Sequence, residues 1–147
     1  MAISFITSGE AAAANGGDPA ITLGATPAAN DLILVAGAIG DNDGVNFTMA
    51  MVTAGYTLVT GTDLFSDDGS DCNLAVFYKF ANGTENTLTF DGQGGTDAGC
   101  AAVALVFRGV NTSTPFDVSS TTATGINTFT PNPPSISWNT ANTWTVA

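Results

Sequence analysis

Apolar and polar residues alternate in short runs along the chain, and each run is bounded by Gly, Asn, Asp or Pro. Turn dipeptides such as Asp43-Gly44 and Asn82-Gly83 stand between the runs. This pattern is typical of an antiparallel sandwich or barrel. It predicts strands at residues 3–8, 20–23, 31–39, 47–52, 57–64, 72–80, 86–91, 100–108, 126–130, 135–138 and 143–147.

A helical pattern is almost absent. The alanine run at residues 11–14 is followed at once by Asn15-Gly16-Gly17-Asp18-Pro19, so one short turn is the most helix that we expect. The predicted fold class is all-β: an antiparallel, jelly-roll-like β-sandwich. We expect one domain over residues 1–147, with the N-terminal part of a longer chain as the alternative.

Three of the predicted strands are apolar on both faces. In residues 101–107, Val103 and Leu105 lie on one side while Ala104 and Val106 lie on the other. A strand of an isolated two-layer sandwich has one polar face, so the second apolar face must be covered. Long loops or another subunit could cover it, and the sequence leaves both open.

The charge of the chain is strongly negative. Lys79 and Arg108 are the only basic residues, against thirteen acidic ones, which gives a net charge of −11. Binding to nucleic acid or to an anionic membrane depends on Lys and Arg, so neither partner is expected. The N-terminus lacks the basic region of a signal peptide, and no apolar run reaches the length of a membrane helix. We therefore expect a protein that is made in the cytoplasm without a signal peptide and that either stays inside the cell or leaves it as part of something larger.

The residues that most enzymes need are missing. There is no histidine, no nucleophile elbow and no phosphate-binding loop. A pair of loop carboxylates could hydrolyse glycosides, but loop Asp is also the ordinary turn residue of β proteins. We predict that the chain is not an enzyme.

Carboxylates in one loop could instead bind calcium. Asp67, Asp68 and Asp71 place several hard oxygen ligands together, as Ca²⁺ prefers, and Asp41 and Asp43 form a second such group. Solvated turns are the alternative for both loops. No other cofactor is expected.

Four residues are candidates for structural roles. Cys72 and Cys100 form either a disulfide or two buried thiols. Arg108, the only arginine, is expected to pair with Asp117 or to clamp a carbonyl there, with a ligand contact as the alternative.

Two tryptophans and two tyrosines could together form a platform on which a sugar stacks, although aromatic residues at strand positions are usually core. They are Trp138, Trp144, Tyr56 and Tyr78.

Several segments resemble a loose group of bacteriophage virion proteins described as tail-fibre, capsid-decoration or structural proteins. They are Asp31-Leu-Ile-Leu-Val-Ala-Gly, Leu74-Ala-Val-Phe-Tyr-Lys79, Ala104-Leu-Val-Phe-Arg-Gly-Val110, Thr114-Pro-Phe-Asp-Val118 and the N-terminal Ala2-Ile-Ser-Phe with Asn15-Gly-Gly-Asp-Pro19. The resemblance implies a β-sandwich displayed on the outside of a particle, usually in several copies.

The sequence therefore predicts a structural virion protein, either a capsid decoration or a tail-associated domain on the particle exterior. Its expected partners are other virion proteins and further copies of itself. The negative charge agrees, because an exterior protein has no packaged DNA to bind. The alternative is a glycan-binding module for receptor recognition.

Overall fold

The computed structural model describes residues 2–40, 48–66, 72–93, 99–123, 134–141 and 143–146. Within these ranges the chain is all-β, as predicted, and the strands pair only in antiparallel ladders. In the described part of the chain, no helix is long and apolar enough to cross a membrane. The strands are β1 (Ser4–Ala13), β2 (Ala20–Thr22), β3 (Leu32–Gly40), β4 (Thr57–Leu58), β5 (Leu64–Ser66), β6 (Cys72–Phe80), β7 (Thr87–Thr89) and β8 (Gly99–Arg108).

The predicted strand at 72–80 is confirmed at both ends, and those at 20–23, 31–39, 86–91 and 100–108 are confirmed to within two residues. The one predicted at 57–64 is two short strands, and the described residues 48–52 of the one predicted at 47–52 make a single bridge, between Met51 and Phe90. The predicted strands at 135–138 and 143–147 carry no strand pairing in their described residues, and 126–130 lies outside the described residues.

The alanine run predicted as a helical turn belongs to β1 instead. Ala11, Ala12 and Ala13 pair with Ala102, Ala101 and Cys100 of β8. The helix propensity of alanine amounts to only a few tenths of a kcal/mol per residue over most other residues. A continuous ladder to a buried strand outweighs that preference.

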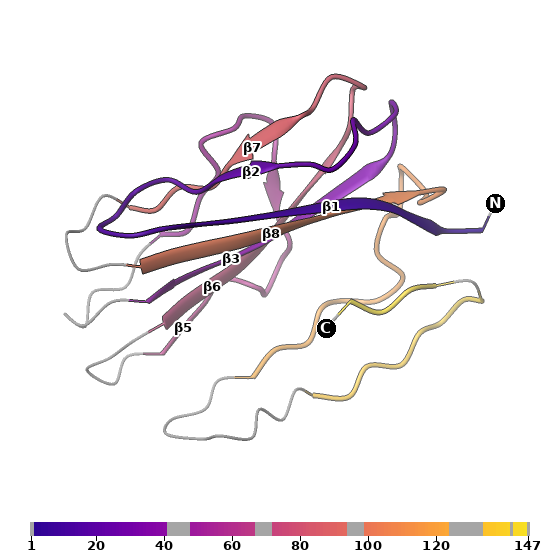
Figure 1. The fold of residues 1–147 in the computed structure, drawn as a ribbon. Coiled ribbons are helices and arrows are strands. Elements are labelled where there is room, and N and C mark those ends of the chain that lie inside the picture. Colours follow the sequence, from indigo (N-terminus) through magenta and orange to yellow (C-terminus); the bar gives the residue numbers. More distant parts are fainter. Residues whose placement is uncertain are drawn as a thin grey trace.

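The strands form two sheets. The main sheet has the order β1-β8-β3-β6-β4, with β5 also pairing with β6, and β2 pairs with β7 in a small sheet that lies over one face of it (Figure 1). The pairs β1–β8, β2–β7 and β3–β6 are those that a rolled-up hairpin of eight strands makes in a jelly roll. Because β4 and β5 pair with β6 and not with each other, the complete jelly roll stays a prediction.

The core lies between the main sheet and the small sheet. Alternate residues of β3 and β8, such as Ile33, Val35, Ala104 and Val106, face inward and are fully buried. Phe90 lies across β3, where a Cβ at position 37 would stand 2.2 Å from its ring, so only glycine fits there.

Candidate functional site

The face of the main sheet that points away from this core is also apolar, and we call it the outer face. Since side chains alternate along a strand, it is formed by the residues between the buried ones. The pairing register brings these residues side by side across four strands. They are Phe5, Ser8, Glu10 and Ala12 of β1, Ala101, Val103, Leu105 and Phe107 of β8, Leu32, Leu34, Ala36 and Ala38 of β3, and Leu74, Val76, Tyr78 and Phe80 of β6.

The chain after β8 covers one end of the outer face. The described residues of this segment, 109–123, 134–141 and 143–146, which we call the arm, run on the side of the main sheet opposite to β2 and β7 (Figure 1). The ring of Phe116 packs edge-on against Tyr78, with centroids 5.1 Å apart, and Trp144 packs against Phe107 at 5.6 Å. Phe107 is buried as a result.

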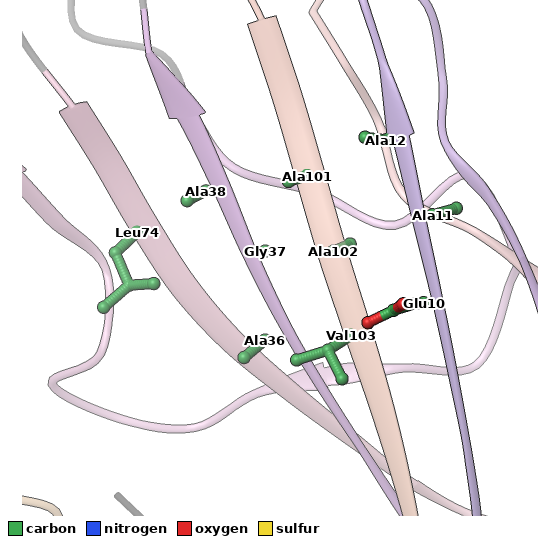
Figure 2. A pocket seen from close by; sticks show the side chains of 10 residues that line it. All are labelled: Glu10, Ala11, Ala12, Ala36, Gly37, Ala38, Leu74, Ala101, Ala102 and Val103. Carbon is green, nitrogen blue, oxygen red and sulfur yellow. The ribbon is translucent and has the colours of Figure 1, made fainter.

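The other end of the outer face is open. There it forms a shallow depression whose floor is made largely of alanine side chains (Figure 2). Leu74 and Val103, both more than a third exposed, rise from β6 and β8. The arm thus covers one part of the second apolar face that the sequence predicts, and the other part of that face is exposed. The residues that line the depression through their outward side chains are Glu10, Ala12, Ala36, Ala38, Leu74, Ala101 and Val103.

One charged group stands in this depression. Glu10 of β1 lies opposite Val103 of β8 and is the only charged residue at an outer-face position of the four long strands (Figure 2). Lys79 and Arg108 fall on the alternate, core-side positions of their strands. An apolar surface with a single carboxylate suits packing against another apolar surface, and it offers no second group for acid–base chemistry.

No protein-family model, curated protein or solved structure matches this chain. Any function must therefore be argued from the geometry of the chain itself.

The predicted calcium ligands Asp67, Asp68 and Asp71 lie outside the described residues, as do Asp41 and Asp43. The calcium site therefore stays a prediction. Among the residues that are described, no three His, Cys, Asp or Glu side chains come together in a way that could hold a metal ion.

Cys72 and Cys100 are not joined in a disulfide. Cys100 pairs with Ile39 of β3 and faces the core, whereas Cys72 pairs with Gly40 on the opposite face. Because β3 lies between them, two strand spacings of about 4.8 Å separate their backbones, beyond the reach of a disulfide. The expectation of two buried thiols is right for Cys100 and wrong for Cys72, which is exposed.

The predicted partner of Arg108 is wrong. Its guanidinium donates two hydrogen bonds, each 2.8 Å long, to the carboxylate of Asp31. Asp117 lies in the arm and accepts hydrogen bonds from the backbone amides of Asn139 and Thr140. Nearness in sequence suggested Asp117, but the pairing of β3 with β8 brings Asp31 to the end of β8.

The four aromatic residues do not gather into one platform. Tyr56 packs against the core with Lys79 over its ring, whereas Tyr78 lies on the outer face against Phe116. Trp138 is the most exposed of the four, at 65%.

Sequence reasoning missed the anchoring role of Glu85. Its buried carboxylate accepts hydrogen bonds from the backbone amides of Asn82, Gly83 and Thr84 and pairs with Lys79 at 3.0 Å. A glutamate two residues after an Asn-Gly dipeptide was the available signal. Both carboxylate oxygens of Glu85 are occupied by the backbone amides of this loop and by Lys79.

Proposed function

We propose that the chain is a structural protein of a bacteriophage virion, a capsid decoration or tail-associated domain on the particle exterior. The observation that carries this proposal is the open apolar end of the outer face. Together with the exposed apolar side chains of the arm on the same side of the molecule, this open end forms an apolar surface of the kind that marks protein interfaces.

The placement of charge supports the same proposal. Several acidic residues, among them Asp18, Asp63 and Asp91, stand outside the strands, while the outer face carries only Glu10. With a net charge of −11, the chain is repelled by nucleic acid and is kept soluble wherever it is exposed. An apolar face for docking and an acidic remainder for solvent suit a protein that lies on the outside of a DNA-filled particle.

Immunogold labelling tests this proposal. Antibodies raised against the purified chain should label the particles of the phage that encodes it in negative stain, at either the capsid or the tail. Label that stays in the soluble fraction after particles are pelleted would contradict the proposal.

A glycan-binding module is the second candidate, and the exposure of Trp138 and Trp144 favours it. They are 65% and 54% exposed on the arm, and an exposed indole ring can stack on a sugar. A glycan array probed with the chain in the presence of Ca²⁺ should show signals that Trp138→Ala removes. A blank array contradicts this candidate and leaves the first one standing.

A further inference from the structure

The exposed large apolar side chains of the described residues gather on one side of the molecule. All except Val52 lie on the outer face or on the arm that runs beneath it (Figure 1). Val52 stands on the opposite side, where its backbone amide bonds to Thr89 of β7. The outer-face and arm residues are Phe5, Leu74, Val103, Phe116, Ile136, Trp138, Trp144 and Val146.

The arm has the alternating apolar and polar residues of a β-strand, but its described residues form no ladder with another strand. Ile136 and Trp138 alternate with serines, and Trp144 and Val146 stand on either side of a threonine. Such alternation is typical of a segment with one face against an apolar surface. Yet these four side chains are 36% to 65% exposed, and the described part of the arm pairs with no strand. The contacts of the arm with its own sheet, such as that of Trp144 with Phe107, therefore leave much of its apolar side-chain surface available to a second surface.

The depression alone is too small for a stable interface. Three strand spacings of about 4.8 Å by about five residues of 3.3 Å rise make an area of roughly 200 Å². A stable protein interface buries about 800 Å² on each partner. A partner that covers only the depression would bind weakly, so the interface has to include the apolar residues of the arm as well.

The charge of the chain indicates which partner fits. Two copies that each carry a charge of −11 repel each other, unless they meet where acidic groups are few. The depression contributes only Glu10, and the described residues of the arm contain only Asp117, whose carboxylate already accepts hydrogen bonds from Asn139 and Thr140. A basic partner would favour the acidic loops instead. This nearly neutral, apolar surface fits a second copy of the chain.

We propose that the arm of one copy lies across the depression of a second copy, so that Trp138 and Ile136 cover Leu74 and Val103 of the neighbour. This inference deepens the proposed structural role and rests on it. The arm would supply the missing cover for the open end of each outer face, and the exposed apolar surface of both partners would be buried at once.

Light scattering of the purified full-length chain gives the first test. The wild-type chain should have the mass of a dimer or a larger closed assembly. Val103→Glu places a charge in the depression and should weaken association by about 100-fold or more, because the charge would be buried without a partner. Val52→Glu makes the same change at an exposed valine on the opposite side and should leave the mass unchanged. A monomeric wild-type chain overturns the proposal, and so does equal weakening by both variants.

Mixing two defective variants tests whether the arm itself enters the depression. Trp138→Ser damages the arm and leaves the depression intact, whereas Val103→Glu does the reverse. Each variant alone should be monomeric, while the mixture should associate, because the intact arm of one can bind the intact depression of the other. The mixed dimer keeps one of the two contacts, so it should need a higher concentration than the wild-type chain. A mixture that associates no more than either variant alone overturns the exchange of arms.

The immunogold experiment separates this inference from the proposed function. A chain that is monomeric in solution and still labels particles contradicts the contact between copies alone. A chain that associates but labels no particle contradicts the virion role and leaves the contact between copies in place.

Discussion

The guanidinium of Arg108 and the carboxylate of Asp31 face each other through two parallel hydrogen bonds, at the end of the main sheet. Asp31 directly precedes β3 and is almost fully buried, and Arg108 is the last residue of β8. The backbone amide of Ala28 also donates to Asp31, so the carboxylate fixes the turn that leads into β3. The pair thus joins two central strands and the loop before them.

Asp31→Asn should destabilise the fold by on the order of 1–3 kcal/mol, since it removes the charge that both Arg108 and Ala28 bind in a buried position. The pKa of Asp31 lies below its usual range because Arg108 donates hydrogen bonds to the charged form. Urea unfolding measures the loss. Asp117→Asn is the matched control: it removes a carboxylate from the arm, and its midpoint should stay near that of the wild-type chain. A larger loss of stability from Asp117→Asn than from Asp31→Asn would mean that the hydrogen bonds of Asp117 in the arm stabilise the fold more than the pair of Asp31 with Arg108.

Glu85 should make stability depend on pH in the acid range. Burial disfavours its charged form, but hydrogen bonds from Asn82 and Lys79, among others, outweigh burial and lower the pKa from 4.5 to about 2. Its contribution, on the order of 3 kcal/mol, is therefore complete above about pH 4.5 and is lost as the pH falls toward 2. Unfolding free energies of the wild-type chain and Glu85→Gln should differ at pH 6 and converge near pH 2. A difference that stays constant over this range would show that Glu85 does not act through its charge.

Gly37→Ala should lower the free energy of unfolding by about 1–3 kcal/mol, because the added methyl group would overlap the buried ring of Phe90. Gly99→Ala provides the comparison, since a Cβ at that position meets nothing within 4 Å. In thermal melts, the midpoint of Gly37→Ala should lie clearly below that of Gly99→Ala. Replacing Phe90 by leucine in the Gly37→Ala background should recover part of the loss, and the absence of any recovery would argue against this overlap as the cause.

The two cysteines should differ in reactivity. Burial, with Asp18 and Asp91 nearby, raises the pKa of Cys100 to about 11, so its reactive thiolate is scarce at pH 8. Cys72 is exposed. A thiol reagent should modify one cysteine per native chain at pH 8 and two after unfolding. Cys72→Ser should abolish the native reaction, and a native chain that reacts twice would mean that the core opens readily at Cys100.

The central strands could be predicted from the sequence because their patterns are decided by local composition. Residues 72–80 are mostly apolar on both alternating faces, and turn residues stand at both ends of the run. The same pattern predicted a covered outer face, and the arm covers one end of it while the other end is exposed. What it could not give was the extent of that cover, since this depends on where the arm runs after Arg108.

Contacts between residues that are distant along the chain could not be predicted from the sequence. Asp31 meets Arg108 only because β3 and β8 are neighbours in the sheet, and no local feature reveals that order. The strand assigned to Ile136 and Trp138 failed for a related reason: alternation shows that a segment suits a sheet, but the ladder partner must exist nearby. The depression likewise depends on four strands from separate parts of the chain.

The strand order also has a consequence for how the protein is made. In the main sheet β1 pairs with β8 alone, so Ser4 cannot pair until Arg108 has been synthesised. On the ribosome, the first strand has no ladder partner until nearly the whole sheet has been synthesised, and β3 stays without one of its two neighbours for as long. Folding dominated by such distant pairings is slow, of order milliseconds to seconds. The apolar strands are exposed during that interval, and a net charge of −11 opposes association between neighbouring chains.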